Sequence, residues 1–272
     1  MNWFRAKAFI GYYIKAVTKF NTHSPFLYDF VISILDTKKN YYVFDSIEAH
    51  RKFLLKSDKT LQINDFGAGS KVLASKAKKV SEIAKSSLSS ENKCRILFNM
   101  ILNFKCKNIL ELGTSLGISS SYLASTGETR HVYTLEGDTT IAELAKSTHQ
   151  SLGLKNIDVH TGKFIDTLPD ILNKIECVDF AFLDGHHQEQ ATLDYLEMVI
   201  QKCHEQSIII VDDIYWSEGM SRAWEKIKNR PDVTLTIDLF DIGIVFFRKQ
   251  LSKENITYIP YHYKPWKIGL FG

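Results

Sequence analysis

Asn108-Ile109-Leu110-Glu111-Leu112-Gly113-Thr114-Ser115-Leu116-Gly117-Ile118-Ser119-Ser120 is the stretch of sequence that decides the fold of this chain. An apolar run ends in an acid, two glycines follow four positions apart, and a serine-rich segment begins after them. This order predicts a strand, a tight turn and a helix N-terminus, where glycine lets the backbone approach a ligand closely. The spacing E-x-G-x-x-x-G lacks the middle glycine of the G-x-G-x-x-G pattern that seats a dinucleotide pyrophosphate. It therefore indicates another ligand or a purely structural turn, and the residues that follow favour the ligand.

Downstream of this turn, strand and helix patterns alternate regularly. Strands are predicted at 108–112, 131–135, 157–160, 178–183 and 207–211. Helices are predicted at 115–125, 139–152, near Ile171, at 189–204 and at 219–229. The alternation predicts an α/β fold with a parallel sheet covered on both faces and right-handed crossovers. Two more strands, at 233–240 and 242–248, are separated by Asp241 alone and must therefore form an antiparallel hairpin.

The N-terminal third has helical periodicity of its own. Apolar and aromatic residues recur at helical spacing from Trp3 to about Leu35, interrupted at 21–25, and further helices are predicted at 46–55 and 91–104. A second glycine turn, Asp65-Phe66-Gly67-Ala68-Gly69-Ser70, is a rival for the ligand loop. We reject it because no strand ending in an acid follows about 20 residues on, and a lysine- and serine-rich stretch follows instead. It is interpreted as a flexible turn near the pocket or as an ordinary turn.

The last residues, 251–272, show no clear periodicity. These boundaries divide the chain into an N-terminal helical or cap region (1–90), a main domain (91–250) and a C-terminal tail (251–272). The domain organisation is thus one large domain with appendages, which suits a length of 272 residues.

Composition is that of a globular protein, with 44% hydrophobic and 24% charged residues. Charge is uneven: residues 1–107 carry 19 Lys/Arg against 8 Asp/Glu, and the rest carry 15 against 23. A basic first third suits an acidic partner or a solvated helix face. Four scattered cysteines form no C-x-x-C pair and indicate neither a zinc cage nor a disulfide framework. With no signal peptide or long apolar span, we expect a cytoplasmic protein without a transmembrane segment.

Ligands of open α/β sheets bind at the carboxyl ends of the strands, so the residues there are the informative ones. Glu136 ends the second strand, 19 residues beyond Gly117 and near the interval of about 20 expected for a carboxylate that binds ribose hydroxyls. Gly162-Lys163-Phe164 follows the third strand and is a candidate for the other side of the ligand. Phe164 as plain core is the alternative.

The glycine turn and the closing hairpin resemble those of class I S-adenosylmethionine (SAM)-dependent methyltransferases. That resemblance implies a doubly wound, mostly parallel seven-stranded sheet whose last strand is antiparallel, with an N-terminal helical extension. It also implies SAM as cofactor. The cofactor-binding residues that it implies are Glu111, Gly113, Thr114, Ser115, Gly117, Glu136, Gly162, Lys163, Phe164 and Asp184.

Carboxylates follow the fourth and fifth predicted strands, where Asp184 and the pair Asp212-Asp213 stand. At one sheet edge they would repel one another unless a cation neutralises them or one is protonated, and oxygen ligands suit Mg²⁺ or Ca²⁺. The layout resembles metal-dependent O-methyltransferases of the catechol type and of the type acting on macrolide and aminocoumarin sugars. This implies Asp184, Asp212 and Asp213 as ligands of Mg²⁺. Alternatively, Asp212 caps a turn and Asp184 only orients the cofactor.

His186 and His187 are candidates for the base that accepts a hydroxyl proton, because imidazole titrates near neutrality. Asp184 completes the predicted catalytic set. The predicted function is SAM-dependent methylation of an oxygen on a small molecule, such as a sugar or phenol. A homodimer is one assembly that we consider. Alternatives are an RNA or nucleic-acid methyltransferase, disfavoured by the lack of RNA-binding motifs, and a non-catalytic nucleotide-fold binding protein.

Overall fold

The computed structural model describes residues 3–21, 24–64, 75–250 and 252–264. Contacts divide the chain into two compact units. The middle unit comprises Asp36–Ala181, and the terminal unit comprises Met1–Leu35 together with Phe182–Gly272. The three segments expected from the sequence, 1–90, 91–250 and 251–272, stay a prediction.

In the middle unit, parallel strands have the order β6-β3-β4-β5. They are β3 (Asn108–Leu112), β4 (His131–Glu136), β5 (Ile157–Thr161) and β6 (Val178–Leu183), the last of which runs on into the terminal unit. Leu112 pairs with Leu135, and Glu136 pairs with Thr161. This register brings the carboxyl ends of β3, β4 and β5 to one edge, where the predicted cofactor residues stand.

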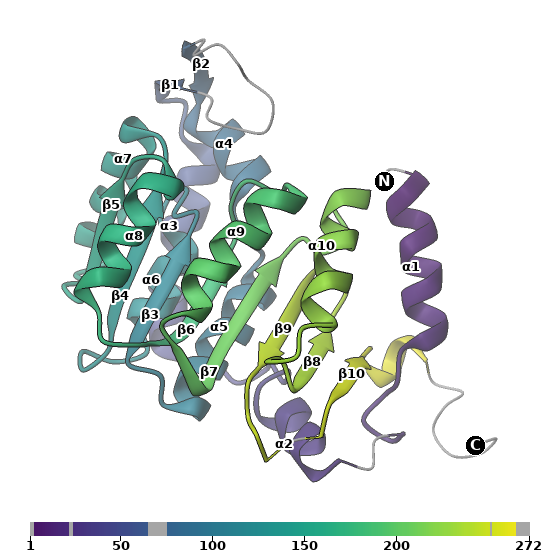
Figure 1. Cartoon of the computed structure of the whole chain (residues 1–272). Helices are drawn as coiled ribbons and strands as arrows, with labels where there is room; N and C mark the ends of the chain where they lie inside the picture. The colour runs from purple at the N-terminus through teal and green to yellow at the C-terminus, as the bar shows by residue number, and fades with distance from the viewer. Residues whose placement is uncertain (1–2, 22–23, 65–74, 251, 265–272) are drawn as a thin grey trace. The chain divides into compact units, whose positions relative to one another are not determined.

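Six helices accompany these strands among the described residues of the middle unit (Figure 1). They are α3 (Tyr42–Lys56), α4 (Val80–Ser87), α5 (Glu91–Phe104), α6 (Ile118–Ala124), α7 (Thr139–Ser151) and α8 (Phe164–Lys174). Side-chain caps set two of their starts: Ser90 accepts from the Lys93 N–H at 3.3 Å, and Asp138 from the Ile141 N–H at 2.9 Å. The helices bury an aromatic core that includes Phe44, Phe98 and Tyr122.

One part of the middle unit departs from the sequence prediction. No strand or helix is predicted in the lysine- and serine-rich stretch that follows the second glycine turn, but β2 (Ser75–Lys79) pairs antiparallel with β1 (Thr60–Asn64) and α4 follows directly. β2 has no apolar alternation, which is the signal that sequence reasoning relies on, and main-chain hydrogen bonds pair it with β1. The glycine turn itself, Asp65–Ser70, lies outside the described residues.

The terminal unit holds strands in the order β10-β8-β9-β7, with the end of β6 beside β7. They are β7 (Cys203–Asp212), β8 (Leu235–Asp238), β9 (Ile242–Phe246) and β10 (Glu254–Thr257). Because β9 is antiparallel to both β7 and β8, the predicted hairpin is confirmed, and so is the mostly parallel sheet. β10 adds a strand parallel to β8 in the tail, where only four residues pair and no periodicity was visible.

Helices of the terminal unit are α1 (Trp3–Lys15), α2 (Pro25–Ser33), α9 (Glu189–Ile200) and α10 (Glu218–Lys228), with a short 3₁₀ turn at Tyr261–Tyr263. The helix expected over 189–204 stops at Ile200, because β7 begins at Cys203. Figure 1 shows α1 beside α10. Tyr12 and Ala16 of α1 are buried with Ile259, and the Tyr12 hydroxyl donates to the Tyr258 carbonyl. No helix in the described ranges is both long and apolar enough to cross a membrane.

Candidate active site

The glycine turn after β3 forms as the sequence predicts. Gly113 and Gly117 have φ values of 103° and 84°, which favour glycine. The N–H groups of Gly113 and Thr114 donate to the Leu135 carbonyl at 3.0 and 3.1 Å, so the turn is bonded to the end of β4. A Cβ on Gly117 would lie 2.8 Å from His149 Nε2 and 3.2 Å from the Ala145 backbone. Glycine is therefore needed at Gly117 for both conformation and space.

Glu136 stands at the end of β4 and bonds to the same turn. Its Oε2 accepts from the Ser115 N–H at 2.8 Å, and its Oε1 accepts from the Asp138 N–H at 3.1 Å. Burial raises the pKa of Glu136, while these backbone N–H groups oppose that rise. Each carboxylate oxygen keeps further acceptor capacity for a ligand hydroxyl.

Glu111 is fully buried beneath the turn, with none of its surface exposed. Its Oε2 accepts from the Thr134 hydroxyl at 2.6 Å, and among the described residues Oε1 has no hydrogen-bond partner. Burial raises the pKa of Glu111 to about 7, against the opposing effect of the Thr134 and Ser119 hydroxyls. Glu111 therefore lies under the turn and contacts β4 through Thr134.

His149 of α7 is a site neighbour that sequence reasoning missed. Its Nε2 lies 2.8 Å from the Ser120 hydroxyl, and burial lowers the pKa of His149 to about 4. It is the residue that a Cβ on Gly117 would meet first. The only sequence signal was a histidine in the last turn of a helix, and that signal is too common to be informative.

The segment after β5 supplies the third predicted contact. Gly162 has φ 142°, and its N–H donates to the Glu136 carbonyl at 2.9 Å. Lys163 is exposed and precedes α8, whereas Phe164 is 7% exposed. Phe164 is thus largely in the core, and Gly162 and Lys163 are the accessible members of the set. In the middle unit, Glu111, Gly113–Gly117, Glu136 and Gly162 all belong to the carboxyl ends of adjacent strands.

The predicted catalytic residues lie in the terminal unit, in the loop after β6. His186 and His187 both have positive φ values, 67° and 34°, which is a strained pair for residues with side chains. His187 Nε2 lies 3.7 Å from Asp184 Oδ1, and the His187 ring is 6.4 Å from that of Trp216. Burial and the neighbouring His187 lower the pKa of His186. Both imidazoles are half-buried.

The aspartate pair ends β7. Asp212 is 3% exposed, and the N–H of Asp213, at φ 50°, donates to the Asp241 carbonyl at 2.7 Å. The donor set of Asp184, Asp212 and Asp213 is all carboxylate, which suits a hard cation. Within the described part of the chain, however, their ligand atoms do not all lie within 4.8 Å of one another. The three carboxylates are therefore suitable ligands for a cation, but their ligand atoms are more widely spaced than a shared cation site requires.

Aromatic residues and Arg5 surround this loop. The Arg5 guanidinium binds Asp241 at 2.6 Å and lies 5.9 Å from the Trp216 ring and 5.6 Å from the Phe240 ring. Trp216 is 54% exposed, whereas Trp224 is fully buried. The contact of Arg5 joins residues 236 positions apart and had no sequence signal.

Comparisons with known proteins show what this chain is similar to. Residues 110–214 match a family model described as a methyltransferase domain. The O-methyltransferase imqG of Aspergillus flavus is 30% identical over 114 residues, which are 40% of this chain and 45% of that protein. The catechol O-methyltransferase of Niastella koreensis is 28% identical over 113 residues, 40% of this chain and 50% of that protein. The chain thus spans about half the length of these curated relatives.

Among solved structures, the O-methyltransferase from Bacillus cereus in complex with S-adenosylhomocysteine (SAH) superposes with a TM-score of 0.56 at 21% identity. The match covers 80% of this chain and 96% of that one, and it shows a shared fold. The predicted resemblance to class I SAM-dependent methyltransferases is confirmed. The residues that match the family model, 110–214, include the glycine turn, Glu136 and all three aspartates.

Proposed function

We propose that this protein transfers the methyl group of SAM to a hydroxyl oxygen of a small molecule. The proposal rests mainly on the hydrogen bond from the Ser115 N–H to the Glu136 carboxylate. This bond joins the glycine turn after β3 to the acid at the end of β4. The methyltransferase-domain match over the same residues supports the assignment, as do O-methyltransferases among the relatives. When bound, SAM supplies an electrophilic methyl group on a sulfonium.

The middle unit would bind the cofactor through the predicted residues. Glu136 is proposed to accept the ribose hydroxyls through its remaining lone pairs, while Gly113 and Gly117 let the backbone approach the amino-acid part. Glu111 is proposed to support the turn from below through Thr134 rather than to reach the ligand by both oxygens. Gly162 and Lys163 would border the adenine.

The terminal unit would remove the acceptor proton. His186 has its pKa lowered and is neutral near pH 7, so its imidazole is able to accept a proton. His187 has Asp184 beside it, and that carboxylate would orient the ring and stabilise the imidazolium. Glutamine replacements made one at a time would distinguish these two bases by which one abolishes turnover.

We also propose that a divalent cation assists the reaction. Asp184, Asp212 and Asp213 would hold Mg²⁺, which would lower the pKa of an acceptor hydroxyl and orient it. Loss of S-adenosylhomocysteine formation in EDTA, with recovery on adding Mg²⁺, would support the requirement for a divalent cation. Unchanged turnover in EDTA removes it and leaves the transferase.

The cofactor assignment is tested by calorimetric titration of the purified protein with S-adenosylhomocysteine. Glu136→Gln is expected to weaken binding by about tenfold or more, because an amide accepts hydroxyl hydrogens less strongly than a carboxylate. Glu128, which is exposed and precedes the start of β4 whereas Glu136 ends it, offers a matched Glu→Gln control that is expected to retain wild-type affinity. Absence of binding by the wild-type protein contradicts the proposed function. Labelled-SAM turnover with phenols and sugars then identifies the acceptor.

A further inference from the structure

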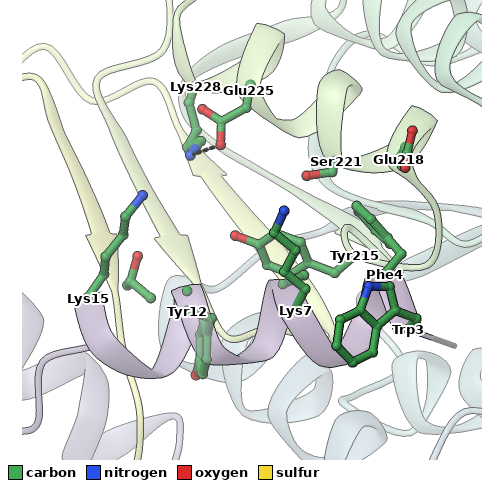
Figure 2. Close-up of a pocket in the computed structure, with 13 residues that line it drawn as sticks. Trp3, Phe4, Lys7, Tyr12, Lys15, Tyr215, Glu218, Ser221, Glu225 and Lys228 are labelled. Carbon is green, nitrogen blue, oxygen red and sulfur yellow. Dashed lines mark hydrogen bonds and ion pairs between the residues drawn. The ribbon is translucent and has the colours of Figure 1, made fainter. Parts of the chain in front are cut away.

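A groove of about 510 Å³ lies between α1 and α10 in the terminal unit, apart from every residue assigned above to the cofactor or the base. Figure 2 shows Lys7 and Lys15 of α1 extending toward α10, with Tyr215 behind Lys7 as part of the floor. The volume falls within the range typical of small-molecule sites. The Tyr215 hydroxyl donates to Asp238 Oδ2 at 2.6 Å, so this part of the floor is fixed.

One side of the groove is cationic. α1 supplies Lys7 and Lys15, and its sequence WFRAKAFIGYYIK contains no acid. No carboxylate of the described residues pairs with either ammonium. The third lysine, Lys228, is already neutralised by Glu225 at 2.7 Å. Two lysine charges of the groove therefore remain available to an anion.

The other end of the groove is aromatic. Figure 2 shows Trp3, Phe4 and Glu218 toward this end and Lys15 toward the opposite end, with Lys7 between. Trp3 is 83% exposed, a large fraction for an indole side chain. Glu218 would repel an anion from this end, so an amphipathic ligand would bind in one orientation, with its charge toward the lysines.

Gly11 opens the middle of the groove. A Cβ built on it meets no atom within 4 Å, and its backbone is helical. Glycine inside a helix destabilises it by about 1 kcal/mol relative to alanine, so local helix formation gives no reason for it here. The free space that Gly11 leaves for a ligand against the α1 backbone is a reason for glycine at this position.

We propose that this groove binds an anionic small molecule, with its phosphate or carboxylate on Lys7 and Lys15 and a planar apolar body against Trp3 and Phe4. Ammonium groups bind such anions by charge-assisted hydrogen bonds, and aromatic side chains contribute apolar area. The proposal is independent of methyl transfer, because none of these residues belongs to the proposed cofactor site or base. Binding is therefore measured directly and without SAM.

Phenyl phosphate is the first probe, titrated into the full chain by calorimetry, with tryptophan fluorescence as a second readout. Inorganic phosphate, benzoate and phenol form the comparison arms. Saturable binding of phenyl phosphate or benzoate below about 10 mM is expected, with weaker binding of both inorganic phosphate and phenol. The double variant Lys7→Gln/Lys15→Gln is expected to weaken it by about tenfold or more. Lys52→Gln/Lys56→Gln on α3 removes the same charge from exposed lysines and is expected to bind like wild type.

Substitution of Gly11 separates binding from folding. Gly11→Phe fills the groove and is expected to abolish binding, whereas Gly11→Ala keeps most of the space and raises the unfolding temperature. The proposal is overturned if neither phenyl phosphate nor benzoate binds saturably, if both lysine pairs weaken binding equally, or if a folded Gly11→Phe variant binds like wild type. Equal affinity for phenol would also overturn it, because the anion would then contribute nothing.

Discussion

Gly117 illustrates how one residue connects conformation, packing and the candidate site. Its φ of 84° belongs to the left-handed region, and a Cβ there would be 2.8 Å from His149 Nε2. The backbone on the other side, at Ala145, does not have the freedom of a long side chain to move. Two separate penalties therefore oppose any replacement of this glycine.

Gly117→Ala is expected to lower the free energy of unfolding by about 3 kcal/mol, combining left-handed strain with overpacking. It should also weaken S-adenosylhomocysteine binding, because the turn must shift. Gly153→Ala is the matched control: its φ is 69°, but a Cβ there meets nothing within 4 Å. Strain alone should cost that variant about 1 kcal/mol. Urea unfolding measures both, and equal losses would show that crowding at Gly117 is unimportant.

At the scale of elements, α10 packs on β9 through a large residue against a small one. Trp224 is fully buried, and a Cβ on Gly243 would lie 2.6 Å from two atoms of its ring. A glycine in a strand usually weakens it, and here it creates the space that the indole fills. The position of α10, and with it one wall of the α1–α10 groove, depends on this pair.

Gly243→Ala is expected to destabilise the protein by about 2 kcal/mol through overpacking. In a Trp224→Phe background the same change should be milder, because the smaller ring leaves room for the methyl group. A double-mutant cycle by chemical denaturation measures that coupling. Additive effects within about 0.5 kcal/mol would contradict the contact.

At the scale of the whole molecule, two buried groups beside the glycine turn give opposite contributions to pH-dependent stability. The pKa of Glu111 rises from 4.5 to about 7, so between these values the folded state keeps a proton that the unfolded state has lost. That contribution lowers stability as pH rises. The pKa of His149 falls from 6.5 to about 4, so the unfolded state binds the extra proton and stability increases with pH. Where the windows overlap, the two contributions offset each other.

Removing one group should reveal the other. Relative to wild type, Glu111→Gln is expected to gain stability as pH rises from about 4.5 to 7, on the order of 3 kcal/mol over that window. His149→Gln should show the opposite trend relative to wild type, losing stability by a similar amount as pH rises from about 4 to 6.5. Denaturant unfolding at closely spaced pH values measures both. Profiles parallel to wild type for both variants would contradict the two shifted pKa values.

Much of the fold follows from local pattern. The bounds of β3 and β6 agree with their predicted ranges residue for residue. A short apolar run between turn signals is enough to predict a buried strand. The antiparallel hairpin of β8 and β9 was a consequence of a connection too short for a crossover. By contrast, β2 and β10 are held by main-chain pairing with β1 and β8, and their residues carry no comparable signal.

For the site, the sequence by itself determined which residues stand at the carboxyl ends of the strands, because strand ends and glycine spacing are local properties. Tertiary structure alone decided what those residues contact. It buried Glu111 against Thr134 and bonded Glu136 to Ser115. It also opened a groove beside Gly11. These outcomes join positions far apart in the chain, and packing between elements, rather than the pattern within any one of them, sets such contacts.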